Sequence, residues 1–233
     1  MDHEMDPERV ARIASRLAEA ERDPQQRLCG ASAAIVRVSG AGIVLISQGK
    51  TLGNLCASNA FTQTIEDVQF AMGEGPCVDA SRTKAPVLVP NLAEVAATHW
   101  PGFREAASTA GACAAFGFPL LVGSVCIGAL DLYPRRTGDL SDDQFANAIV
   151  VAHLVGRILL GWQSAAPEGA LAWQLEQVPA HRAVVHQATG MVSVQAGLSL
   201  DDALMLIRAH AFAEGRRIDA VARDIVDRLL RLE

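Results

Sequence analysis

A glycine-rich loop with the sequence GEGPC, at residues 73–77, is the first place in this chain where residue types and spacing could support chemistry. Gly73 and Gly75 permit backbone angles that other residues avoid, and Pro76 directs the chain into a helix that begins near Cys77. Backbone N–H groups at a helix start can bind an anion, and the same position lowers the pKa of a thiol. The loop therefore either forms the entrance of a ligand-binding site with a reactive Cys77, or is a tight turn in which Cys77 only packs.

The other cysteines and the histidines are weaker candidates. His99 and His153 could hold a haem or a metal ion, but each stands alone, without a second ligand at metal-binding spacing. Cys77 could form the redox pair of a thiol reductase with Cys113 or Cys126 if the fold brings them together. The chain has five cysteines, at positions 29, 56, 77, 113 and 126. Because this count is odd and includes no CxxC pair, we expect reduced thiols and no metal site.

Two adjacent arginines near the end of the chain could bind phosphates. Arg216 and Arg217 lie at a link between two expected helices, where guanidinium groups can reach a ligand without disturbing a core. Neighbouring polar or small residues could contact unpaired bases, with a solvated helix face as the alternative for each. These further candidates are Arg182, His186, Gln187, Thr189, Gly190, Arg208 and Arg223. The small size of Gly190 fits either helix packing or a close approach of nucleic acid.

Three short amphipathic helices between residues 181 and 230 would position these side chains. Apolar residues recur at steps of three and four, and Gly197 and Gly215 separate the helices. Ser199 and Asp202 have the spacing of a capping box that opens the second helix. Because each helix is too short to be stable alone, the three must share a core.

The first 162 residues alternate strand-like and helical patterns, which predicts an α+β fold. Asp6 caps an expected N-terminal helix, and Ser141 with Gln144 opens a long apolar one. Residues 108–130 carry no charge, but their glycines predict a buried hairpin instead of a membrane span. Strands are expected at 33–38, 42–47, 52–58 and 85–92 and on either side of a turn at 122–124, and further helices at 61–70 and 103–110.

The C-terminal pattern resembles the ANTAR domain, a three-helix RNA-binding module of bacterial transcription antitermination regulators. The resemblance rests on HQATGM at 186–191, GLSLDDAL at 197–204 and RRIDAVARDIV at 216–226. It implies binding to RNA hairpin loops. Thr189 stands where many members carry lysine, so a contact made by that lysine does not carry over to this chain.

The N-terminal pattern resembles the GAF domain, a bacterial sensor fold with an antiparallel sheet flanked by helices. The resemblance covers about residues 10–160 and rests on GEGPCVDA, VLVPNL, HWPGF and FGFPLLVGSVCIGALDLY. The GEGPC loop resembles the branch fused to ANTAR modules in actinobacteria. It implies that this part senses a small molecule or a redox signal, with Gly73, Gly75, Cys77 and His99 as the candidate residues. The motifs of cyclic-nucleotide-binding members are not recognisable, and no cofactor is identified.

Composition and charge set limits on the function. The net charge is −6, and residues 181–233 carry seven arginines against seven acidic residues, so a broad basic surface for nucleic acid is excluded. Charged residues interrupt the N-terminus, and we expect a cytoplasmic protein without a membrane segment. The expected parts are a helix at 1–28 that packs on the sensor, a GAF sensor at 29–162, a linker helix at 163–180 and an ANTAR domain at 181–233.

Together these features predict a non-enzymatic regulator in which sensing controls RNA binding and antitermination. Apolar stripes on the long helix and the linker predict a homodimer. Two alternatives remain at this stage, namely a DNA-binding regulator and a thiol reductase. The third C-terminal helix carries Asp219, Asp224 and Asp227, which would repel DNA phosphates, and a reductase would leave the C-terminal module unexplained.

Overall fold

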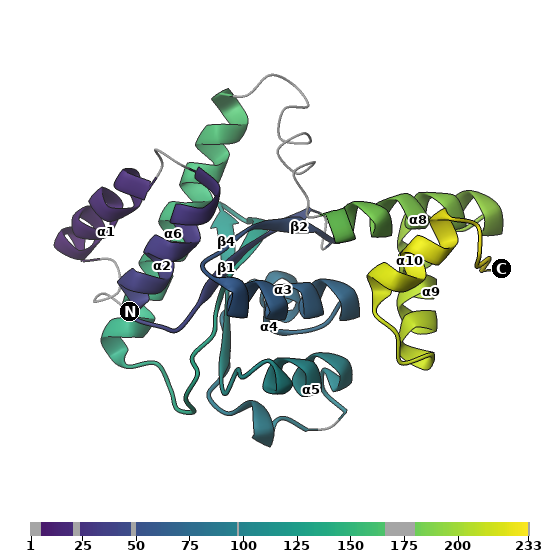
Figure 1. The fold of residues 1–233 in the computed structure, drawn as a ribbon. Helices are drawn as coiled ribbons and strands as arrows, with labels where there is room; N and C mark the ends of the chain where they lie inside the picture. The colour runs from purple at the N-terminus through teal and green to yellow at the C-terminus, as the bar shows by residue number, and fades with distance from the viewer. Residues whose placement is uncertain (1–5, 21–23, 48–49, 97, 166–179, 233) are drawn as a thin grey trace. The chain divides into compact units, whose positions relative to one another are not determined.

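The computed structural model describes residues 6–20, 24–47, 50–96, 98–165 and 180–232 (Figure 1). The chain divides into two compact units, Met1–Leu171 and Ala172–Glu233, each with its own buried core. The expected helical middle of the linker, with Leu171, Leu175 and Val178, lies outside the described residues.

The first unit has a five-stranded sheet whose paired neighbours all run antiparallel, as the α+β prediction required. The order is β2-β1-β5-β4-β3, so β5 lies at the centre and β2 at one edge. The hairpin predicted within residues 108–130 is confirmed by the pairing of β4 with β5. The strands are β1 (Ala41–Ser47), β2 (Lys50–Ala57), β3 (Val87–Val89), β4 (Ala115–Val122) and β5 (Val125–Leu132).

Helices cover both faces of this sheet (Figure 1). On one face lie α2 (Pro24–Val36) and α6 (Asp142–Ala165), with α1 (Pro7–Ala20) packed against both. On the other face lie α3 (Ala60–Met72) and α4 (Pro76–Thr83), followed by the short η1 (Leu92–Glu94) and by α5 (Pro101–Thr109). The sheet is therefore buried between two helical layers, and alternate residues of β5 face opposite layers.

Side-chain caps start the helices where the sequence predicted. The Asp6 carboxylate accepts hydrogen bonds from the N–H groups of Glu8 and Arg9 at 3.3 and 3.4 Å. The predicted capping box at α6 is confirmed, because Gln144 N–H donates to Ser141 Oγ and Ser141 N–H donates to Gln144 Oε1. The same Gln144 amide also donates through Nε2 to the backbone oxygens of Val36 and Arg37. One side chain thus starts α6 and holds the end of α2.

The strand predicted at residues 33–38 is wrong, because most of this segment forms the end of α2. Its sequence, AAIVRV, is rich in β-branched residues, which favour strands in the absence of other constraints. In the fold α2 packs on the sheet and also on its neighbours α1 and α6, so Ala33, Ile35 and Val36 are all buried although they lie on different sides of the helix. Packing on two sides here outweighs the local preference for a strand.

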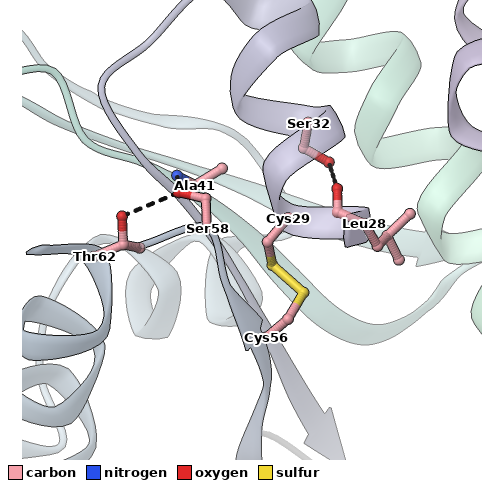
Figure 2. Close-up of a disulfide and its surroundings, with 7 residues drawn as sticks. All are labelled: Leu28, Cys29, Ser32, Ala41, Cys56, Ser58 and Thr62. Atoms are coloured by element: carbon pink, nitrogen blue, oxygen red, sulfur yellow. Dashed lines mark hydrogen bonds between the residues drawn. A yellow bond between two sulfur atoms is a disulfide. The ribbon is translucent and has the colours of Figure 1, made fainter. Parts of the chain in front are cut away.

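The expectation that all cysteines are reduced thiols is also wrong. Cys29 of α2 and Cys56 of β2 form a disulfide with a Cα–Cα distance of 5.9 Å (Figure 2). The free cysteines are Cys77, Cys113 and Cys126. The bonded pair therefore contains neither partner that the reductase alternative required for Cys77.

One described helix, Asp142–Trp162 within α6, is long and apolar enough to span a membrane by length and composition. Half of this apolar stretch is buried inside the fold, because α6 packs on β4, β5, α1 and α2. The apolar stripe that was expected to pack on the sheet includes Ala148, Val155 and Leu159, which are buried there. The apolar character of α6 is thus explained by its place against the sheet.

The second unit consists of α8 (Ala180–Ala196), α9 (Leu200–Ala213) and α10 (Ile218–Val226), which pack against one another as the three amphipathic patterns predicted. Ser199 caps α9 by accepting a hydrogen bond from the N–H of Asp202 at 3.1 Å. Gly197 and Gly215 both take positive φ values, which suits glycine at helix ends. The shared core comprises Val185, Ala188, Val192, Ala203, Ile207, Ala211, Val221, Ala222 and Ile225.

Candidate functional site

The GEGPC loop joins three helices. Gly73 ends α3 in the left-handed conformation with φ 68°, and Gly75, with φ 132°, precedes α4. The Glu74 carboxylate reaches α5, where its Oε1 accepts the N–H groups of Gly102 and Phe103 at 2.7 and 2.9 Å. A Cβ atom at Gly75 would lie 2.3 Å from Gln69 Oε1, so only glycine allows this approach. The two glycines predicted to need unusual backbone angles therefore have a structural role.

The same geometry argues against an anion site at the start of α4. The N–H of Cys77, at this helix start, already donates to Gln69 Oε1 at 3.2 Å. Cys77 is buried, and burial, followed by the negative charges of Asp131 and Glu66, raises the pKa of its thiol well above the ordinary value. This shift is opposite to the one that would activate the thiol. Cys77 is therefore packed in the core, in surroundings that disfavour its thiolate.

A buried polar cluster lies directly beneath the loop. We define it by four side chains that are all 3% exposed or less, namely Glu66, Gln69, Asp131 and Tyr133. Gln69 Nε2 donates to Tyr133 Oη at 2.7 Å and to Asp131 Oδ2 at 3.2 Å. Tyr133 Oη donates to Glu66 Oε1 at 3.0 Å, and Cys77 forms a hydrogen bond with Asp131. Side chains from α3, β5 and the residue after β5 are thus connected into one network.

Two carboxyl groups in one buried cluster cannot both be ionised at low cost. Burial, and next the charge of Glu66, raises the pKa of Asp131 well above its usual range. Burial, followed by the charges of Asp131 and Glu66, raises the pKa of Tyr133 as well. The cluster therefore retains a proton at a pH where exposed carboxyl groups are ionised. Groups perturbed in this way by burial and a partner charge are often found at functional sites.

Glycines on the neighbouring strands make room for the cluster. Gly42 of β1 and Gly117 of β4 both pair with Asp131 on the central strand. A Cβ atom at Gly42 would lie 2.2 Å from Glu66 Oε1, and one at Gly117 would lie 2.7 Å from the backbone oxygen of Pro76. The sequence patterns did not predict this cluster, although an aspartate between Leu130 and Leu132 of an apolar strand was a signal for it.

His99 lies apart from the polar cluster, on the exposed side of α4. Its Nε2 is 3.5 Å from Asp79 Oδ2, which also accepts a hydrogen bond from Trp100 Nε1 at 3.1 Å. Arg82 binds the other oxygen of Asp79 at 2.6 Å. In the described part of the chain, no group of three or more His, Cys, Asp or Glu side chains could hold a metal ion. His99 therefore belongs to a surface cluster around Asp79, and the structure does not bring it together with Cys77.

In the second unit, the candidate arginines lie against acidic residues. Arg216 binds Asp224 at 2.5 Å. The Asp219 carboxylate, which is nearly buried, binds Arg217 Nε at 2.9 Å and a terminal nitrogen of Arg223 at 3.0 Å. The acidic residues of α10 thus hold the arginines in place, and α10 is less repulsive to phosphates than its sequence indicated.

The pKa of Asp219 shows that its two arginine partners affect this carboxyl more strongly than burial does. Burial alone raises the pKa of this carboxyl, but the hydrogen bond and charge of Arg217, together with the charge of Arg223, lower it below the ordinary value. The side chains of Arg217 and Arg223 remain 75% and 56% exposed. Asp219 therefore positions two guanidinium groups that still face solvent. Arg208 differs from them, because burial lowers its pKa to about 10.

The remaining candidate residues for RNA binding on α8 differ in their exposure. His186 and Gln187 are exposed, and a Cβ atom at Gly190 would meet nothing within 4 Å among the described residues. Thr189 faces the other way: it is 6% exposed, and its hydroxyl donates to the backbone oxygen of Val185 at 2.7 Å. Arg182 lies in the first turns of α8, and its side chain is outside the described part. Packing within the unit therefore explains Thr189 but not the small size of Gly190.

Comparisons with known proteins agree with this division. Residues 19–159, more than half of the chain, match the family model of the GAF domain, and residues 173–226 match that of the ANTAR domain. No curated protein sequence matches the chain.

Solved structures that resemble the chain are GAF domains or similar folds. The GAF domain of an Acinetobacter phosphoenolpyruvate-protein phosphotransferase has 13% identity and a TM-score of 0.51, with 68% of this chain and 94% of that chain covered. The corresponding domain from Coxiella burnetii has 12% identity and a TM-score of 0.50, with 67% and 95% covered. At such identities the likeness concerns the fold alone. The chain therefore belongs to the GAF domain family and carries an ANTAR domain near its C-terminal end, the architecture of a signal-responsive antitermination regulator.

Proposed function

We propose that this protein binds RNA hairpin loops through its second unit and that the GAF unit controls this binding. The observation that carries the proposal is the exposed side of α8, where His186 and Gln187 stand beside open space at Gly190 in the unit that matches the ANTAR domain. Unpaired bases are recognised by stacking and by hydrogen bonds to their edges, which an imidazole and an amide can provide. Arg217 and Arg223 supply phosphate contacts from fixed positions.

The proposal places the protein in the cytoplasm, where RNA is transcribed, and makes it a homodimer whose two ANTAR domains hold two hairpins. No catalytic step is required, because a ligand or redox event needs only to favour one of two arrangements. A bias of about 1 to 3 kcal/mol is sufficient for such a switch.

The test is a filter-binding titration of the full chain with RNA carrying two small-loop hairpins, at several salt concentrations, with the same DNA sequence as control. We expect binding that depends on the loop sequence, with one two-hairpin RNA bound per dimer. Arg217→Ala should weaken binding and lower the slope of log Kd against log salt by about 0.7, the value for one lost phosphate contact on a single strand. His186→Ala should weaken binding without changing the slope, because stacking does not release counterions.

Arg12→Ala is the matched control, since it removes an exposed arginine from α1 of the other unit. An equal loss of affinity in Arg12→Ala and Arg217→Ala would show that only net charge matters and would contradict the proposed surface. Equal binding of RNA and DNA would favour the DNA-binding alternative.

Gly190→Ala separates close RNA approach from helix packing. Because the added methyl group meets nothing within 4 Å in the described structure, the substitution should stabilise α8 by about 0.5 to 1 kcal/mol. If RNA approaches this side of α8 closely, the same methyl group should weaken RNA binding by about tenfold. Thermal unfolding and filter binding measure the two effects. A variant that is more stable and binds RNA as tightly as the native chain would remove Gly190 from the interface.

A further inference from the structure

The Cys29–Cys56 disulfide cross-links a helix and a strand that also pack against each other. The bond links α2 to β2, the edge strand of the sheet, across a sequence separation of 27 residues (Figure 2). Cys29 is fully buried and Cys56 is 7% exposed. The outer side of β2 pairs with no strand among the described residues. Of the two residues, Cys56 is the more exposed, so its sulfur is the one that we assign as the point of attack by a thiolate.

The two ends of the bond differ in how firmly they are held. Just beyond Cys56, Ser58 Oγ accepts the N–H of Ala41 at 2.9 Å and lies 3.3 Å from Thr62 Oγ1, so this end of β2 is fastened to β1 and α3. On the helix side, the disulfide is a cross-link added to the packing of α2 on β1 and β2. Opening the bond therefore leaves the strand in place and removes one constraint on the N-terminal half of α2.

The far end of α2 is attached to α6. Gln144 Nε2 donates to the backbone oxygens of Val36 and Arg37, both at 3.1 Å. Arg37 also forms an ion pair with Asp143 at 2.6 Å, and Asn147 Nδ2 donates to the backbone oxygen of Ile35 at 3.4 Å. The end of α2 is thus bonded to α6, the last described helix before the second unit in the sequence.

We propose that Cys29 and Cys56 form a reversible redox site whose reaction partner is a dithiol reductant, and that its state sets the tilt of α2 on α6 and thereby the affinity for RNA. The effect on RNA rests on the proposed function. In the cytoplasm that function requires, disulfides are uncommon and tend to be transient redox sensors. The free cysteines do not form an equivalent pair, because Cys77 is buried on the other face of the sheet, while Cys113 and Cys126 donate to backbone oxygens of Arg135 and Gly128.

The reduction balances as an ordinary thiol–disulfide exchange. A reductant thiolate attacks Cys56 Sγ, the Cys29–Cys56 bond breaks, and Cys29 leaves as a thiolate that takes up a proton. The second thiol of the reductant then attacks the mixed disulfide at the reductant's own sulfur and releases the Cys56 thiolate, which is also protonated. Two electrons and two protons pass to the cysteine pair, and the reductant becomes a disulfide.

The first test equilibrates the full chain with mixtures of reduced and oxidised dithiothreitol, followed by alkylation and mass spectrometry of each cysteine. We expect Cys29 and Cys56 to become labelled together, in a folded protein, and to be protected again when the oxidised form is restored. Hydrogen exchange of residues 24–36 should become at least fivefold faster on reduction, while that of β5 stays unchanged. A bond that opens only when the protein unfolds in urea, or cysteines that never form the bond, would overturn the redox site.

The second test compares RNA binding in the two states, and we expect at least a tenfold difference in Kd. This difference should vanish in Cys29→Ala with Cys56→Val, a pair of apolar replacements chosen to keep the buried site filled, and should persist in Cys113→Ser. Equal affinity in both states, with the pair still cycling, would overturn the coupling to RNA. If neither state binds the hairpins, the proposed RNA function fails, and the labelling and exchange results still decide the redox site.

Discussion

Replacing Asp131 by asparagine should raise the free energy of unfolding at pH 8 by about 1 to 3 kcal/mol, the range seen when buried charge is replaced by neutral groups. Asp131 is fully buried beside Glu66, and burial with that neighbouring charge raises its pKa. The asparagine keeps an oxygen to accept the hydrogen bond from Gln69 Nε2. The variant therefore removes the charge that is difficult to bury while keeping the shape of the network.

The sign of the pH dependence follows from the direction of this shift. In the unfolded chain an aspartate has a pKa of about 3.9, and in the folded protein the pKa of Asp131 is higher. The folded state thus binds more protons, so the contribution of Asp131 to stability is fully present below about pH 4 and is lost as the pH rises through the folded value. Asp131→Asn should remove this loss and flatten the stability profile from pH 5 to pH 8.

Urea unfolding at each pH, followed by circular dichroism, measures this effect. Asp139→Asn is the control, because it removes an exposed negative charge from the loop before α6. A native protein whose stability rises from pH 5 to pH 8, or an Asp131→Asn variant with the native slope, would contradict a proton held in the cluster.

Replacing Gly42 by alanine should lower the free energy of unfolding by about 2 to 3 kcal/mol, as expected for overpacking a filled core. The new Cβ atom would lie 2.2 Å from Glu66 Oε1 and 2.6 Å from Glu66 Cδ. Glu66 cannot easily move away, because it is fully buried and its carboxylate is held by Tyr133. Urea unfolding at pH 7 measures the loss.

Two further variants make this result specific. Gly30→Ala, in the helix α2 with nothing within 4 Å of the new atom, should instead stabilise the protein by about 0.5 to 1 kcal/mol. In a Glu66→Ala background the clash is gone, so Gly42→Ala should cost at least 1 kcal/mol less than it does in the native chain. An undiminished cost in that background would place the strain elsewhere in the sheet.

Local patterns predicted those parts of the fold that local interactions control. The capping box at Ser141 is confirmed, and at Ser199 the hydrogen bond from the N–H of Asp202 to the serine hydroxyl is confirmed. Both were predictable because they join residues three positions apart. The need for glycine at Gly73 and Gly75 was also visible in the GEGPC sequence. What the loop contacts was not visible, because Glu74 caps a helix 28 residues further along the chain.

The features that the sequence did not predict depend on pairs that are distant in the chain. Spacing cannot show that Cys29 bonds Cys56, since the connectivity of cysteines is set by the packing of α2 on β2. The two members of the carboxyl pair, Glu66 and Asp131, looked like ordinary polar positions of a helix and a strand. In contrast, the ion pairs of Asp219 with Arg217 and Arg223 join residues two and four positions apart, so their spacing in the sequence could have indicated them.

The attachment of the N-terminal helices to the start of α6 has a consequence for how the protein is made. Arg9 of α1 binds Asp143 at 2.8 Å and Asn147 at 2.6 Å, and Asn147 lies 138 residues later in the chain. At the usual rate of translation, Arg9 is synthesised roughly 7 to 28 s before that partner. During this time Ile13 and Leu17, which are buried in the finished fold, lack the part of their cover that α6 provides. Until α6 is made, α2 is the described helix against which α1 can pack, so α1 reaches its final place only late in synthesis.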